Sequence, residues 1–300
     1  MNLPVPQRPL LRSLGASPAA AFLASALLCL GCDSGPHGKD AAPTSSQRLA
    51  QISVRLDLPS GSAPAVSVLA FRAEAFDVPS SDVLGAVDPL VAPAPESSCE
   101  LRDVAGTARA LRAQGGMLSL EELDGVFLQV EAGEALHPAP RVYPPLADVV
   151  AGVIAEAGPL DLGEIPDAFT LTFPARDDEP MALRLALPDL PSVADSHEAP
   201  LDVQTSMSMQ GDLVLRLSGP PRTFLEIRPF GAPSAIACAV TTSGWVVVPH
   251  DLLTKLVATA GRAPVSFEAV WRESRLVKAG SETTRVSFEA RSSAVLDLQP

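Results

Sequence analysis

Aromatic residues and lysine are scarce in this chain: aromatics make up 4% of its 300 residues, and only three of its 22 basic residues are lysine. So few flat side chains leave little surface for stacking on sugar rings. The formal net charge of −13 opposes binding to nucleic acid, because that affinity comes largely from neutralising phosphates with Lys and Arg. The composition therefore predicts a protein that binds no nucleic acid.

The sequence motifs of common enzyme and cofactor sites are missing as well. The chain has no Gly-x-Ser-x-Gly elbow, no Walker-type phosphate loop and no Rossmann glycine fingerprint. None of its four histidines has the two-histidine spacing of a zinc site. We therefore expect no catalytic activity and no cofactor. The alternative is an exported enzyme whose active site gathers dispersed residues such as His137, His197 or His250 with acids.

Cys32 follows a segment with the features of a bacterial lipoprotein signal. Arg8 and Arg12 precede an acid-free apolar run over 19–30, and a small residue stands directly before Cys32. The run is too short to cross a hydrocarbon core, which needs about 20 helical residues. Residues 1–31 are thus expected to be a signal peptide, and the Cys32 thiol to carry a diacylglycerol anchor. Plain secretion with cleavage nearby is the alternative.

Residues 32–49 have the composition of a flexible tether. Gly, Pro, Ser, Ala and Asp dominate the stretch, which offers almost no side chain to bury. A chain anchored in this way is expected at the bacterial cell envelope, on the inner or the outer membrane and on its periplasmic or surface face. The expected partners are the membrane, through the lipid, and an envelope protein.

Alternating apolar and polar residues recur at the period of a β-strand. Ile52, Val54 and Leu56 alternate with polar residues, and the C-terminal half repeats the pattern several times. The 30 prolines argue against a helical bundle, because an interior proline removes a hydrogen-bond donor and clashes with the preceding turn. We predict a mainly-β fold, with an antiparallel, immunoglobulin-like β-sandwich domain over 166–300 and a smaller β-rich domain over 50–165.

One segment departs from the strand pattern. Leu252, Leu253 and Leu256 have helical spacing, with Pro249 at the first turn and Asp251 near the positive end of the helix dipole. The spacing predicts a short helix near 249–257 that bridges one end of the sandwich.

The same alternation predicts two environments for the larger side chains of the C-terminal half, the core and a solvated face. Trp245 and Trp271 fall on apolar faces, which predicts that both lie in the core. Arg184, Arg216 and Arg228 fall on the opposite faces and are interpreted as the solvated side of a sheet. Such a solvated face is suited to recognising a protein partner.

Cys99 and Cys238 are the cysteines that remain after export and processing. Cys29 leaves with the signal peptide and Cys32 takes the lipid. Disulfides persist in extracytoplasmic compartments, so we hypothesise a Cys99–Cys238 bond. Two free thiols are the alternative, because the two residues fall in different predicted domains.

A cysteine-bearing strand over 236–240 is followed by a Ser-Gly turn, a valine before Pro249, and the leucine-rich segment 251–256. Together with the 168–174 stretch and the segment around Cys99, this order resembles uncharacterised myxobacterial-type lipoproteins, loosely and over most of 50–298. The resemblance implies a lipid-anchored, β-rich envelope protein without an activity that can be carried over.

Three neighbouring carboxylates, Asp177, Asp178 and Glu179, are a weak candidate for a calcium site, although their spacing is not that of an EF-hand and no other metal site is expected. The function we predict is that of a noncatalytic envelope lipoprotein with a structural or protein-binding role. The alternative is a ligand-binding module for carbohydrate or calcium.

Overall fold

The computed structural model describes residues 47–76, 95, 98–103, 117–130, 134–146, 150–174, 179–187, 189–201, 206–208, 210–230, 234–241, 243–260, 264–279 and 282–299. The described chain is mainly β, as the sequence predicted, and contains one short helix. Within these residues, no helix has the length and apolar character needed to span a membrane.

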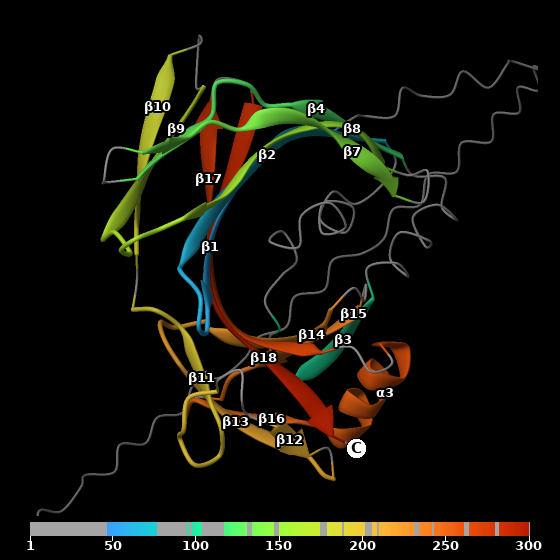
Figure 1. Cartoon of the computed structure of the whole chain (residues 1–300). Helices are drawn as coiled ribbons and strands as arrows, with labels where there is room; N and C mark the ends of the chain where they lie inside the picture. Colours follow the sequence, from blue (N-terminus) through green and yellow to red (C-terminus); the bar gives the residue numbers. More distant parts are fainter. Residues whose placement is uncertain are drawn as a thin grey trace, which may run out of the picture. The chain divides into compact units, whose positions relative to one another are not determined.

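A large sheet of 11 strands runs through this part of the chain (Figure 1). Its strands, in spatial order, are β3 (Cys99–Asp103), β15 (Ser234–Ala239), β14 (Phe224–Pro229), β17 (Val265–Ala279), β18 (Glu282–Gln299), β1 (Gln47–Pro59), β2 (Ala65–Phe76), β4 (Met117–Glu122), β8 (Val150–Asp161) and β7 (Ala139–Leu146), with β12 (Ser206–Ser208) paired to the end of β18. The sheet is mixed rather than purely antiparallel, because β1 pairs in parallel with β18, and β4 with β8.

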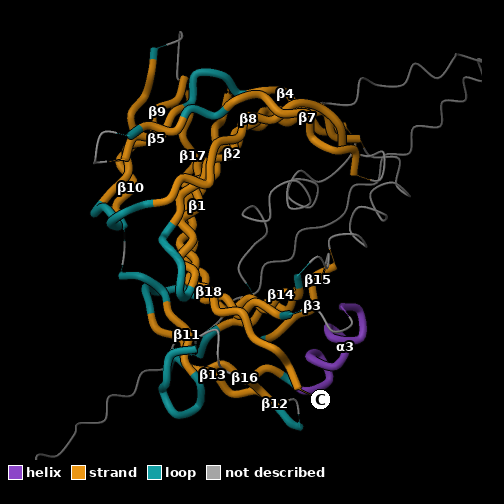
Figure 2. Tube along the Cα trace, in the orientation of Figure 1, coloured by secondary structure: helices purple, strands orange, loops and turns teal. Residues whose placement is uncertain are grey.

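Two smaller antiparallel sheets accompany the large one (Figure 2). The four-stranded sheet contains β10 (Pro180–Ala186), β9 (Ala168–Pro174), β5 (Phe127–Val130) and β6 (Ala135–Leu136). The three-stranded sheet contains β11 (Ser192–Ala194), β13 (Leu213–Ser218) and β16 (Trp245–Val248). The apolar contacts of each small sheet with the large one give the sandwich-like packing that the alternation predicted.

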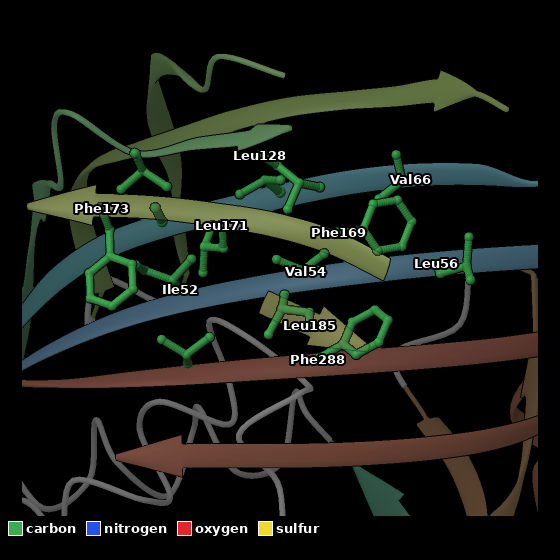
Figure 3. Packing of buried hydrophobic residues seen from close by; sticks show 14 of the residues in the cluster. Ile52, Val54, Leu56, Val66, Leu128, Phe169, Leu171, Phe173, Leu185 and Phe288 are labelled. Atoms are coloured by element: carbon green, nitrogen blue, oxygen red, sulfur yellow. The ribbon is translucent and has the colours of Figure 1, made fainter. Parts of the chain in front are cut away.

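The first core lies between the four-stranded sheet and β1, β2 and β18 (Figure 3). Ile52, Val54 and Leu56, the alternating residues of β1, are fully buried here. The ring of Phe169 meets Phe288 edge-on, with centroids 6.0 Å apart. The same residues that gave the strand period thus supply the packing, since alternate side chains share one face of a sheet.

The second core lies between the three-stranded sheet and a different part of the large sheet. Leu215 and Leu217 of β13 pack with Leu225 and Ile227 of β14 and with Phe267 of β17. The strands β17 and β18 contribute to both cores. In β17, Trp271 belongs to the first core and Phe267 to the second; in β18, Phe288 belongs to the first and Ala294 to the second.

The predicted boundary at 165/166 does not separate two compact units. Residues from Pro43 to Pro300 form one unit. The reason lies in the pairing of β1, near the start of the described chain, with β18 at its end: Ala50 lies opposite Thr284, and Pro59 opposite Ser293. Each core therefore contains residues of β17 and β18, and the 50–165 segment has no large sheet of its own.

The single described helix, α3 (His250–Ala260), agrees with the helix predicted near 249–257. The carbonyl oxygen of Pro249 accepts hydrogen bonds from the backbone N–H groups of Leu252 and Leu253. Asp212, from a distant loop, accepts a hydrogen bond from the backbone N–H of His250 at 2.9 Å and so satisfies one of the free donors at the helix start. Leu253 and Leu256 are buried against the second core.

Gly152 is required where β8 passes β4. Its φ of 142° disfavours an L side chain, and a Cβ at this position would collide with the carbonyl group of Leu120, 2.7 Å from its carbon. Gly152→Ala is therefore expected to destabilise the protein by about 3 kcal/mol in urea denaturation, because backbone must move. Gly163→Ala is the matched control, since a Cβ there meets no atom within 4 Å. Equal stability of the two variants would contradict the close approach of these strands.

Candidate functional site

The face of the large sheet opposite the two cores carries buried charged side chains. The alternation that points Phe288 and Ala290 into the first core points Glu289 and Arg291 the other way. Along this face the register pairs Arg55 and Arg272 with Glu289 from its two sides. We call the set the charge network: Arg55, Asp57, Glu226, Arg228, Glu268, Arg272, Glu289 and Arg291.

Arg291 is the central cation of the charge network. Its Nη2 and Nε donate to Glu289 Oε1 at 2.7 and 3.1 Å, and its Nη1 donates to Glu268. The second oxygen of Glu226 lies 3.8 Å from Nη2. Only 9% of the Arg291 side chain is exposed. The attraction of the three carboxylates outweighs burial and raises the pKa of Arg291, so it stays charged.

Glu289 is the central anion and is fully buried. Besides Arg291, it accepts hydrogen bonds from Nη2 and Nε of Arg272 at 2.6 and 3.0 Å, and Nε of Arg55 lies 3.4 Å from its Oε1. Burial by itself would raise the pKa of Glu289. The attraction of Arg291, Arg272 and Arg55 outweighs burial and lowers the pKa to about 2.

Two other carboxyls of the network have raised pKa values. Burial raises the pKa of Glu268, where Arg291 opposes the rise and the neighbouring Glu226 adds to it. Burial also raises the pKa of Asp57, against the attraction of Arg55 and Arg291. The network therefore holds Glu289 firmly ionised and holds Glu268 and Asp57 less firmly.

The charge network contains four arginines and four carboxylates, so its formal charges cancel. Opposite charges face each other between β17 and β18 and between β18 and β1, where such cross-strand pairs stabilise a sheet. Between β14 and β17 the register instead places Glu226 opposite Glu268, and the guanidinium of Arg291 lies near both carboxylates and offsets their repulsion. A slip of one residue between these strands would move the charged residues into the apolar cores. This arrangement of charges can therefore hold the register of the strands.

Only part of the charge network was anticipated from the sequence. Arg228, interpreted as lying on a solvated face, donates to the buried Glu226, and its side chain is 34% exposed. The available signal was that the charged residues at 268, 272, 289 and 291 share one alternating set, beside apolar residues on the other face. That signal does not say whether such a face meets water or protein.

Cys99 and Cys238, for which a bond was hypothesised from the sequence, form a disulfide between β3 and β15. They lie directly opposite each other in the antiparallel register, with Cα atoms 3.9 Å apart. Cys238 is fully buried in the second core, and Cys99 packs against it. The bond thereby attaches β3 to β15 at the edge of the large sheet, although the two strands are far apart in the sequence.

Several predicted site residues lie outside the described chain or stay apart. Cys32, Asp177 and Asp178 are outside the described residues, and Glu179 is an exposed residue before β10. The described residues contain no group of three His, Cys, Asp or Glu side chains that could hold a metal. The three candidate histidines occupy different elements: His137 stacks on Phe127, His197 lies in a turn after β11, and His250 begins α3.

The two tryptophans have different environments. Trp271 is buried in the core, as predicted. Its ring meets Phe288 edge-on. Trp245 was predicted to lie in the core but is half-buried on the outer face of the three-stranded sheet, beneath the guanidinium of Arg216, which is 5.6 Å from the ring centroid. In β16 both alternating sets are apolar, and packing selected Val246 and Val248 for the core.

No protein-family model, no curated protein and no solved structure matches this chain.

Proposed function

We propose that this protein is a noncatalytic, lipid-anchored bacterial envelope protein with a structural or protein-binding role. The N-terminal signal features and Cys32 support export and anchoring. The disulfide is the observation that carries the proposal, because such bonds persist mainly in extracytoplasmic compartments. The signal-like N-terminal features and the disulfide thus support the same location independently.

A rigid β framework supports the structural part of the proposal. Two cores share β17 and β18, and the charge network fixes the register of the same strands on the other face. The outer face of the three-stranded sheet offers exposed apolar side chains at Val214 and Val247, which lie opposite each other in the register. A small apolar area of this kind on a stiff support suits contact with a protein partner.

Metabolic labelling with palmitate tests the anchor. The full chain expressed in a bacterium is expected to incorporate label and to fractionate with membranes, because the Cys32 thiol and new amino terminus are acylated. Cys32→Ala is expected to remove the label entirely. Cys29→Leu is the matched control, because it changes a cysteine three residues away and places an aliphatic residue there, and it is expected to keep the label. Undiminished labelling of Cys32→Ala would overturn the proposal.

A further inference from the structure

A cavity of about 660 Å³ opens at the end of the second core, where the chain crosses between two sheets. The turn from β13 to β14 and the turn from β15 to β16 form its walls; in both, the first strand and the second belong to different sheets (Figure 1). The volume falls within the range of pockets that bind small molecules.

The lining of the cavity combines apolar and polar residues. Pro220, Pro221 and Val240 are lining residues that leave apolar surface uncovered, and Arg222 is the one charged side chain among the lining residues that the structure describes. Two hydroxyls of the lining are already engaged: Thr223 Oγ1 donates to the carbonyl oxygen of Pro220 at 2.8 Å, and Thr241 Oγ1 donates to that of Trp245 at 2.8 Å. These bonds hold both turns in place, so the cavity is formed before any ligand arrives.

Arg222 occupies a turn position that normally takes glycine or asparagine. The backbone N–H of Thr223 donates to the carbonyl oxygen of Pro220, which closes a four-residue turn with Pro221 second and Arg222 third. Arg222 has a φ of 72°, and proline followed by a positive φ is the pattern of a type II turn. A long side chain in this conformation is strained, and such strain is concentrated at functional sites.

The Arg222 side chain is also free to bind. It is exposed, and it makes no hydrogen bond or ion pair with another residue of the described chain. No carboxylate lines the cavity within the described residues, although the whole chain carries a net charge of −13. Among the described lining residues, an anion would therefore meet one cation and no carboxylate.

We propose that this cavity binds a small amphiphilic anion, with an apolar chain against Pro220, Pro221 and Val240 and a carboxylate paired with Arg222. A guanidinium and a carboxylate form strong charge-assisted hydrogen bonds. This binding site goes beyond the proposed envelope role and does not require the lipid anchor.

Calorimetric titration of the purified full chain in detergent-free buffer tests the site with three probes. Octanoate has both the apolar chain and the charge, 1-octanol has the chain alone, and acetate has the charge alone. Octanoate is expected to bind at least about tenfold more tightly than 1-octanol, and acetate to give no measurable heat. No heat with octanoate, or equal affinity for octanoate and 1-octanol, would overturn the proposal.

Arg222→Asn separates binding from folding. Asparagine tolerates the positive φ, so the variant is expected to keep or raise the wild-type Tm while its affinity for octanoate falls about tenfold or more. Arg275→Asn is the control, because this exposed arginine pairs with Glu273 on β17 and does not line the cavity. Wild-type affinity in Arg222→Asn, or an equal loss in Arg275→Asn, would refute the assignment of Arg222.

Discussion

Replacing Glu289 by glutamine is expected to lower the free energy of unfolding at pH 7 by about 3 to 5 kcal/mol, because the change removes the carboxylate that two buried arginines share. Arg291 and Arg272 are at most 9% exposed and both donate to this carboxylate. Neither guanidinium can give up its proton at neutral pH, so both must stay charged in a protein environment. Urea denaturation at pH 7 gives the difference directly.

Glu273→Gln is the matched control for that prediction. Glu273 also pairs with an arginine on the large sheet, Arg275, but the two side chains are 42% and 51% exposed. Exposed pairs contribute little, so this variant is expected to change stability by less than about 0.5 kcal/mol. A loss in Glu289→Gln no greater than in the control would show that the charge network does not hold the sheet together.

The stability lost in Glu289→Gln is expected to depend on pH. The pKa of Glu289 is about 2 in the folded protein and near 4.5 without its partners, so its contribution is complete above 4.5 and is lost as the pH falls from 4.5 to 2. Glu268 and Asp57 have raised pKa values, so their protonation as the pH falls favours the folded state and opposes this loss in both proteins. The stability difference between wild type and Glu289→Gln is therefore expected to shrink between pH 4.5 and 2.

Removing the Cys99–Cys238 bond is expected to destabilise the protein by about 5 kcal/mol. The bond joins residues separated by 139 positions, and cross-linking so long a loop restricts the unfolded chain strongly in the chain-entropy estimate. Guanidinium denaturation with and without reductant measures this effect in the wild-type protein.

The double variant Cys99→Ala with Cys238→Ala provides the comparison for that experiment. The variant loses the sulfur packing of the buried Cys238 as well as the bond, so it should be no more stable than the reduced wild type. Reductant should leave the variant unchanged. An identical denaturation midpoint for oxidised and reduced wild type would contradict the predicted stabilisation.

Local patterns were sufficient for the strands and for the helix. Ile52, Val54 and Leu56 have one environment because alternate residues share a face, whatever the strand pairs with. Helix α3 was predictable for a similar reason, since leucine spacing and the proline at its start act within a few residues. Both features depend on neighbours in the sequence.

The charge network could not be predicted, because burial of Glu289 depends on partners from β1, β17 and β18. The sequence shows Arg55 and Glu289 more than 200 positions apart, and only their parallel register brings them together. The position of Trp245 was undetermined for a related reason. Both faces of β16 are apolar, so local alternation favours neither.

By itself, the amino-acid sequence determined that this protein is built from strands. Its N-terminal segment resembles a lipoprotein signal, and the sequence offered Cys99 and Cys238 only as a possible pair. Tertiary structure decided that one large sheet joins both halves, which face of β16 is outside, and that alternating charges on β17 and β18 neutralise one another. Period-two alternation is a local property of the chain, whereas pairing of β1 with β18 depends on contacts between distant segments.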